Sequence, residues 1–204
     1  MSIKKIKSWI RSTIIPYKPL KVDKDKWDEQ YIKGHWDYLK SFEQLGRFSI
    51  ISGKFYFYYS GGGSVLDLGC GEGVLQKMIK PYKYSNYVGV DVSENAINIA
   101  SEESDEKTSF ICSDISTFEP DSTFDMIVFN ESLYYLDEPN KVLHRYRRYL
   151  NKEGLIIISM WDYKERNNKI WKLIQSDFKP NHETIITADN KITWIIKSLR
   201  PTKD

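Results

Sequence analysis

The sequence is poor in the residues that define several protein classes. It has only two cysteines, Cys70 and Cys112, which are too few for a disulfide framework and have no metal-ligand spacing. Its three histidines are scattered and have no cysteine pairs beside them, so they predict no metal site. We therefore expect no bound metal and a reduced, cytoplasmic setting.

Long apolar runs and a strong net charge are also absent. No run approaches the roughly 20 apolar residues that span a bilayer, and the N-terminus lacks the continuous apolar stretch of a secretory signal. The net charge is only +2, which gives no electrostatic reason to expect a nucleic-acid partner. Apolar residues make up 41% and aromatic residues 14% of the 204 positions, enough for one domain with a full core.

Residues 1–20 form a basic arm in which isoleucines recur at helical spacing and lysines fall on the other side. This pattern predicts a short amphipathic helix. Such a helix could make a peripheral contact with an anionic membrane through residues 1–15. We expect it instead to pack on its own domain or on a partner. The spaced isoleucines are Ile3, Ile6, Ile10 and Ile14.

Residues 23–60 continue the leader with large apolar residues at a rough three-to-four spacing, which predicts helix. A run of three glycines, at 61–63, then breaks the pattern. We therefore assign residues 1–60 to a basic arm and helical lid, and residues 61–204 to the main domain.

The main domain alternates apolar strands with helices. The predicted strands are 64–69, 87–92, 109–113, 124–130 and 155–160, the last entered through a turn at Gly154. The predicted helices are 72–80, 93–103, 138–150 and 164–178. Two β-prone runs, 184–187 and 192–197, predict a terminal hairpin. Continuously apolar strands between helices predict an α/β fold with a doubly wound, mostly parallel sheet and one antiparallel strand from the hairpin.

A glycine-rich loop follows the first predicted strand, where Val65–Gly73 reads V-L-D-L-G-C-G-E-G. Gly69 and Gly71 remove side chains where the backbone must turn sharply and approach a ligand. The spacing differs from the G-x-G-x-x-G of dinucleotide enzymes. Asp67, two residues before the first glycine, would repel a pyrophosphate and attract a cationic ammonium or sulfonium. The loop therefore argues against a nicotinamide-dependent oxidoreductase.

Two more acids end the next two predicted strands. Asp91 lies about 20 residues after the loop, where an acid binds ribose hydroxyls in nucleotide-binding folds. Asp114 follows the third strand and could accept a hydrogen bond from an adenine amino group. Because the carboxyl ends of adjacent parallel strands share one edge of the sheet, we expect Asp67, Asp91 and Asp114 to converge on one crevice.

These segments resemble the successive signature segments of class I S-adenosylmethionine-dependent methyltransferases. The matching stretches are 65–73, 87–100, 110–115 and 124–136. The resemblance implies a Rossmann-like seven-stranded sheet whose last strand is antiparallel, with S-adenosylmethionine as cofactor and S-adenosylhomocysteine as product. It implies cofactor contacts at Asp67, Gly69, Cys70, Gly71, Asp91, Val92, Asp114 and Ile115.

We assign Asn130, at the end of the fourth strand, to the cofactor site as well. Cys70 has a rival interpretation as a nucleophile, but the family often has a small packing cysteine at this position.

The leader segment 27–39 is similar to the leaders of bacterial methyltransferases that tailor sugars, surface polysaccharides and other small metabolites. In such proteins the leader closes over the cofactor. Arg47 would then pair with the methionine carboxylate. The alternative for Arg47 is a surface salt bridge to Glu43, four residues earlier on the same helix.

Methyl transfer to a neutral hydroxyl can require a general base, and the candidates are Glu131, His35 and His144. We expect His144, which lies mid-helix among arginines, to be a surface residue. Glu131 follows the fourth strand, where the methyl group should point; it could instead cap a helix or contact the cofactor. His35 could cover the pocket or be an ordinary exposed histidine. The residues after Asn130 depart from the Asn/Asp-Pro-Pro-Tyr of N-methyltransferases that act on planar amines, which favours an oxygen acceptor.

We expect the acceptor pocket to come from the leader, from Tyr134 and Tyr135 after the fourth strand, and from Trp161–Asn168. The expected acceptor is a small molecule, such as a sugar or phosphorylated intermediate of a surface polysaccharide, and the expected assembly is a monomer or homodimer.

A basic cluster, Arg145, Arg147, Arg148 and Lys152, could attract a phosphorylated substrate or form a solvated helix face. The alternatives are an N-methyltransferase of a small metabolite and a cofactor-binding protein without catalysis.

Overall fold

The computed structural model describes residues 17–162, 164–175, 177–189 and 191–201. The described part of the leader folds into three helices. They are α2 (Lys24–Ile32), the 3-10 helix η1 (Asp37–Lys40) and α3 (Phe42–Tyr59). The predicted helix over 23–60 is therefore interrupted. Gly34 takes φ +65° after α2, and the N–H groups of Gly34 and His35 close the last turn on the carbonyls of Tyr31 and Gln30. The amphipathic helix predicted in residues 1–15 lies outside the described residues.

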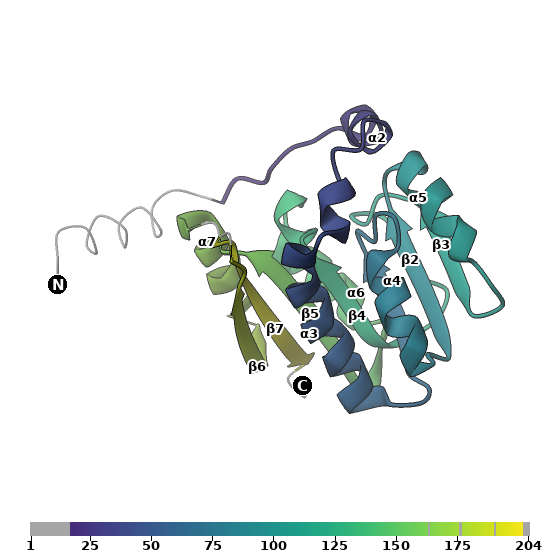
Figure 1. Ribbon diagram of the computed structural model, residues 1–204. Helices are drawn as coiled ribbons and strands as arrows, with labels where there is room; N and C mark the ends of the chain where they lie inside the picture. The colour runs from purple at the N-terminus through teal and green to yellow at the C-terminus, as the bar shows by residue number, and fades with distance from the viewer. Residues whose placement is uncertain (1–16, 163, 176, 190, 202–204) are drawn as a thin grey trace.

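Seven strands form one sheet in the order β3-β2-β1-β4-β5-β7-β6 (Figure 1). The pairs among β1 to β5 are parallel, and β7 runs antiparallel to both β5 and β6. This confirms the doubly wound, mostly parallel α/β fold with a terminal hairpin. The strands are β1 (Ser64–Leu68), β2 (Asn86–Asp91), β3 (Thr108–Cys112), β4 (Phe124–Asn130), β5 (Leu150–Trp161), β6 (Phe178–Thr187) and β7 (Thr193–Pro201).

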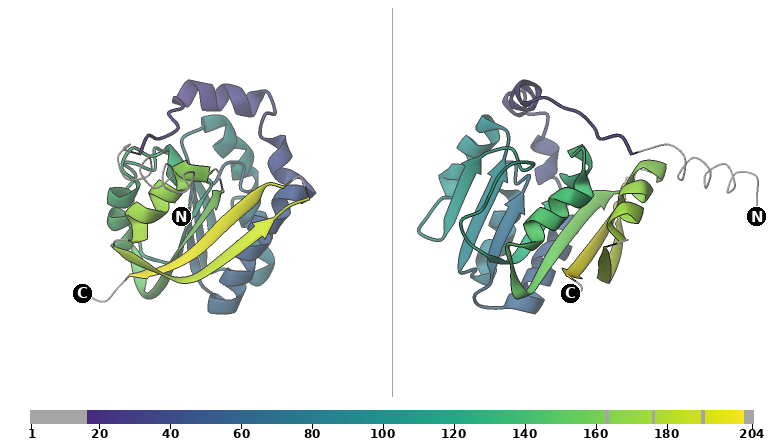
Figure 2. Two further views of the ribbon diagram at one scale, coloured as in Figure 1. Left: turned by 90° about the vertical axis from the view of Figure 1, so that its left-hand side faces the viewer. Right: turned by 180° about the vertical axis from the view of Figure 1, so that it is seen from behind.

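Helices cover both faces of the sheet, so its central strands are apolar on both sides. On one face, Phe48 and Phe55 of α3 and Leu75 of α4 pack with the side chains of β1 and β4. On the other face, Tyr146 of α6 and Trp171 of α7 pack with those of β4 and β5. Figure 2 shows α6 and α7 from behind, opposite α3, α4 and α5. The remaining helices are α4 (Val74–Ile79), η2 (Lys80–Tyr82), α5 (Glu94–Ala100), η3 (Ser101–Glu103), η4 (Leu133–Tyr135), α6 (Pro139–Arg147) and α7 (Lys164–Gln175).

The boundary between α6 and β5 corrects the prediction. Leu150 was expected to end the helix, but it begins β5 and pairs with Phe124. Gly154, expected in a turn, lies inside β5, where the register with β4 shifts between Phe124 and Met126. A bulge therefore replaces the expected turn. The first part of β5 was not predicted because residues 151–153 are polar and lack the apolar pattern of a buried strand.

The edge strand β6 is also longer than the predicted run 184–187, and α7 ends at Gln175 before the predicted residue 178. Most side chains of β6 are exposed, so the strand lacks the alternation that identifies a half-buried strand. Pro180 is tolerated because β6 is at the edge of the sheet. Among the described helices, none is long and apolar enough to cross a membrane.

Candidate functional site

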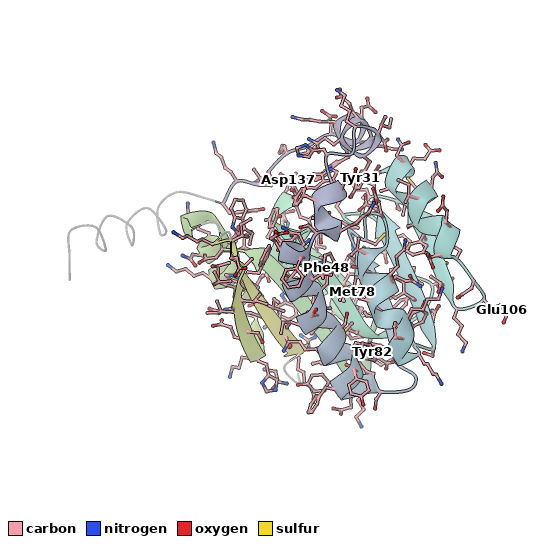
Figure 3. The ribbon with its side chains drawn as sticks, viewed as in Figure 1. Tyr31, Phe48, Met78, Tyr82, Glu106 and Asp137 are labelled. Atoms are coloured by element: carbon pink, nitrogen blue, oxygen red, sulfur yellow. The ribbon has the colours of Figure 1, made fainter. Side chains whose placement is uncertain are left out.

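A cavity of about 940 Å³ lies at the carboxyl ends of β1 to β4. Residues of the glycine loop and of the turns after β2, β3 and β4 line one side, and leader residues such as Tyr31 and Trp36 line the other. Figure 3 places Tyr31 and Asp137 at this end of the molecule, beneath and beside α2, and Tyr82 at the opposite end. The predicted cofactor residues all line the cavity: Asp67, Gly69, Cys70, Gly71, Asp91, Val92, Asp114, Ile115, Asn130 and Arg47.

The glycine loop has a backbone that other residues adopt only with strain. Gly69 and Gly71 take φ values of +86° and +52°. A Cβ atom at Gly69 would lie 2.5 Å from the Cβ of Ser132, and one at Gly71 would lie 2.8 Å from the hydroxyl of Tyr31. The loop is therefore enclosed between the turn after β4 and the leader helix α2.

Asp91 connects the glycine loop to the start of α5. Its Oδ2 accepts a hydrogen bond from the Gly71 N–H at 2.9 Å, and its Oδ1 accepts one from the Ser93 N–H at 3.0 Å. Burial raises the pKa of Asp91, and the backbone N–H groups oppose that rise. The carboxylate thus fixes the shape of the loop and lines the cavity.

Asp67 has a buried oxygen without a partner. The side chain is 1% exposed; its Oδ2 accepts a hydrogen bond from the Tyr87 hydroxyl at 2.6 Å, whereas its Oδ1 has no donor. Burial raises the pKa of Asp67 to about 7. Because a buried acceptor without a donor is costly, this oxygen is suited to a donor or cation brought by a ligand.

The next two predicted contacts differ in exposure. Asp114 is exposed, and its Oδ1 accepts a hydrogen bond from the Ser116 N–H at 2.7 Å. Cys70 is buried, and its burial raises the pKa of the thiol well above the usual range, with the charges of Asp91 and Asp67 adding to the rise. A thiolate is therefore disfavoured at Cys70, which argues against its rival interpretation as a nucleophile.

Arg47 is a buried cation on α3, with 3% of its surface exposed. Its Nε donates to Asn130 Oδ1 at 3.1 Å, and its Nη1 donates to Gln44 Oε1. The guanidinium also lies over the rings of Phe48 and Trp194, 4.5 and 5.5 Å from their centroids. Burial lowers its pKa. The alternative salt bridge is not among the ion pairs of the described residues: Arg47 bonds to Asn130 and Gln44, and Glu43 is exposed.

Glu131 is held in a strained backbone conformation directly after β4, with φ +61°. Its Oε2 accepts hydrogen bonds from the Trp161 N–H at 3.1 Å and the Tyr134 hydroxyl at 3.0 Å. Burial raises the pKa of Glu131, while the charge of Arg47 acts in the opposite direction. The side chain does not cap η4, the 3-10 helix that follows it, because Ser132 is the N-cap there and no side-chain capping bond forms. Glu131 is thus a carboxylate fixed in the cavity wall.

His35, another predicted candidate base, does not lie with Glu131 in the cavity wall. His35 is exposed, lies outside the cavity lining and packs its ring edge-on to Trp36, with centroids 5.1 Å apart. No cluster of three or more His, Cys, Asp or Glu side chains that could hold a metal occurs in the described ranges.

The sequence prediction missed the contacts that fasten the leader to the main domain. Asp28 of α2 accepts hydrogen bonds from the Ser93 hydroxyl at 2.6 Å and the Asn95 N–H at 3.2 Å. Lys40 of η1 forms an ion pair with Glu72, a buried residue of the glycine loop. These partners are far apart in sequence, and no local motif indicates the pairing.

A family model described as "Methyltransferase domain" matches residues 60–199. A malonyl-[acyl-carrier protein] O-methyltransferase of Bacillus cereus is 28% identical over 102 residues, which are 49% of this chain and 38% of that protein. The chain therefore spans well under half the length of this curated relative.

Two solved structures resemble the fold closely. The N-methyltransferase NodS from Bradyrhizobium japonicum, in complex with S-adenosyl-L-homocysteine, has a TM-score of 0.70 and 16% identity, covering 82% of this chain and 92% of that one. The [4+2]-cyclase SpnF has a TM-score of 0.73 and 13% identity, covering 93% and 100%. At these identities the likeness concerns the fold alone.

Proposed function

This chain belongs to the methyltransferase domain family, and from that premise we propose that it transfers a methyl group from S-adenosylmethionine to a small polar acceptor. The observation that carries the proposal is the buried, unpaired Oδ1 of Asp67 beside a glycine loop at the carboxyl end of β1. When bound, the cofactor supplies an electrophilic methyl group on a sulfonium. An aspartate at this point favours a cationic ligand over a pyrophosphate.

We assign the two ends of the cofactor to different parts of the cavity. Asp67 would accept from the methionine ammonium, and the buried Arg47 with Asn130 would hold the methionine carboxylate. Asp91 would bind the ribose hydroxyls and Asp114 the adenine amino group. Cys70, Val92 and Ile115, which also line the cavity, would contact the cofactor between these groups.

We propose that the lid of the site is α2 with η1. These elements reach the glycine loop and α5 through Asp28, Tyr31 and Lys40. In contrast, α3 packs on the sheet through Phe48, Ile51 and Phe55 and belongs to the covering layer. Closure of the lid would keep water from the reacting atoms.

Cofactor affinity is expected to fall as the pH is lowered through about 7. The pKa of Asp67 is raised to about 7, and a methionine ammonium binds the ionised carboxylate. Below that pH the carboxyl is protonated, so binding must release a proton, and the affinity falls toward tenfold per pH unit. Titration calorimetry with S-adenosylhomocysteine from about pH 5.5 to about 7.5 measures the slope.

Asp67→Asn is the matched control for this pH dependence. It keeps the shape of the side chain but cannot ionise, so its affinity should be weaker and nearly constant over the same range. An equal slope in the wild type and in Asp67→Asn would rule out Asp67 as the titrating group.

We propose that the acceptor atom is an oxygen, on a sugar or phosphorylated intermediate of surface polysaccharide biosynthesis. The Glu131 carboxylate supports this, because its raised pKa suits a base that takes a hydroxyl proton. Aromatic rings in the wall also support it, since their flat faces suit the C–H face of a sugar ring. Trp27 lies 5.3 Å from Trp36 and 5.0 Å from Tyr135 between ring centroids.

In this proposal the chain acts mainly by holding and orienting. The cavity wall around Glu131 would hold the acceptor hydroxyl in line with the methyl group. The hydroxyl proton would pass to Glu131 as the methyl carbon exchanges its bond to the cofactor sulfur for a bond to the acceptor oxygen, leaving S-adenosylhomocysteine. Tyr134 and the Trp161 N–H keep the carboxylate in place through their hydrogen bonds.

The test is a screen of acceptors with labelled S-adenosylmethionine, read as methylated product by mass spectrometry. Sugars, phosphosugars and nucleotide-linked sugars form one panel, and small amines form the other. We expect labelled ether products from the first panel. Product from amines alone would favour N-methylation of a small metabolite, and binding without turnover in both panels would favour a non-catalytic cofactor-binding protein.

A further inference from the structure

The loop that follows β3 is held in place by side chains of α6. Arg145 Nη2 donates to the Ile115 carbonyl at 2.7 Å, and Arg145 Nη1 donates to the Ser116 carbonyl. The Tyr146 hydroxyl donates to the same Ile115 carbonyl at 2.8 Å and approaches the Phe118 carbonyl at 3.3 Å. Two adjacent residues of one helix therefore bind three carbonyls of one loop.

The same loop carries Asp114 into the cavity wall. Its internal hydrogen bonds form a tight turn, in which Asp114 Oδ1 accepts from the Ser116 N–H at 2.7 Å and the Asp114 carbonyl accepts from the Phe118 N–H at 2.8 Å. These bonds determine the shape of the turn but not its position relative to the sheet. The loop is attached to the sheet by the Ser113 N–H, which donates to the Asp91 carbonyl at 2.8 Å, and by the packing of Ile115 and Phe118 against the core. The bonds from Arg145 and Tyr146 add a direct hold on the carbonyls that follow Asp114.

Arg145 differs from the other cations of the basic cluster. Its side chain is 20% exposed, against 65% for Arg148, and it lies over the Tyr146 ring at 5.1 Å from the centroid. Its nearest carboxylate oxygen, in Glu119, is 3.9 Å from Nε. The guanidinium therefore bonds mainly to backbone carbonyls, and its planar shape lets it donate to two of them at once.

We propose that Arg145 is a positioning residue for the nucleobase end of the cofactor site. It fixes the Asp114 loop so that the Asp114 carboxylate is already in place to accept from an adenine amino group. Without these bonds the loop would be held less firmly, and the ordering then required on ligand binding would reduce the affinity. The inference rests on the proposed function, because it assumes that Asp114 faces an adenine.

The test compares S-adenosylhomocysteine with its inosine analogue, in which an oxygen replaces the adenine amino group. Arg145→Met keeps the apolar stem and removes the donors, and Arg148→Met is the matched control on the same helix. We expect Arg145→Met to weaken S-adenosylhomocysteine binding about tenfold and to abolish most of its preference over the analogue. Arg145→Lys should recover part of both, and Arg148→Met should change neither.

A double-mutant cycle with Asp114→Asn identifies the route of the effect. If Arg145 acts through Asp114, the preference in the double variant equals that of Asp114→Asn alone. A preference fully retained in Arg145→Met, or additive losses in the double variant, would overturn the inference. Should Arg145→Met not fold, Tyr146→Phe removes the second set of loop bonds and should lower the preference in the same direction; an unchanged preference there also overturns it. Wild-type chain that binds neither ligand would instead refute the proposed function on which the inference rests.

Discussion

Replacing Asp91 by alanine is expected to abolish measurable binding of S-adenosylhomocysteine, with a loss of at least about 100-fold. The carboxylate has two tasks at once in our account. It would bind the ribose hydroxyls, and it accepts the Gly71 and Ser93 N–H groups that shape the glycine loop. The substitution removes the ribose contact and leaves two N–H groups without their acceptor.

Titration calorimetry with S-adenosylhomocysteine measures this loss, and thermal unfolding checks that the variant still folds. Asp121→Ala, in an exposed loop after β3, is the matched control and should bind like the wild type. Asp91→Asn keeps one acceptor oxygen and should lose less than Asp91→Ala. If a folded Asp91→Ala variant bound with wild-type affinity, the assignment of the ribose site would be refuted.

The second large effect is expected for Glu131→Gln, which should lower kcat about 10²- to 10⁴-fold. Glutamine has the same shape and can still accept from the Trp161 N–H and the Tyr134 hydroxyl. It cannot take a proton from the acceptor. The affinity for S-adenosylhomocysteine should therefore change only a few-fold, so that catalysis and cofactor binding separate.

Single-turnover rates with an acceptor found in the screen, alongside calorimetric affinities, measure this separation. His35→Gln is the matched control, because His35 is exposed and outside the cavity wall. It should leave both quantities unchanged. A Glu131→Gln variant with a wild-type rate would show that the acceptor needs no base at this position.

Much of the side of the cavity formed by the sheet was predictable from local sequence. Asp67, Asp91 and Asp114 share one cavity because each lies at or beside the carboxyl end of a parallel strand, and the apolar residues of β1 and β2 made these strands recognisable. The glycine loop was recognisable because Gly69 and Gly71 adopt left-handed conformations that other residues avoid. In both cases the residues that the site requires are close together in the sequence, so they form a recognisable local motif.

On the other side of the cavity, the resemblance led us to expect the leader and Arg47, but the contacts that hold them were not predictable because they join distant parts of the chain. Asp28 meets Ser93, 65 residues later, and Trp194 reaches the cavity only through the pairing of β7 with β5. Arg145 binds carbonyls, which every residue carries, so its targets have no signature in the sequence. His35 and Arg47 both lie in the leader, but His35 is exposed in the turn after α2, whereas Arg47 is buried because α3 packs on the sheet.

The central claim is that the cavity between the glycine loop and the leader binds a nucleoside that carries an amino-acid ammonium group, as S-adenosylmethionine and S-adenosylhomocysteine both do. Titration of the wild-type chain with S-adenosylhomocysteine, in parallel with the reduced nicotinamide dinucleotide NADH, tests it most directly. We predict saturable binding of one S-adenosylhomocysteine per chain and no heat of binding from NADH. Saturable binding of NADH with none of S-adenosylhomocysteine would contradict the account.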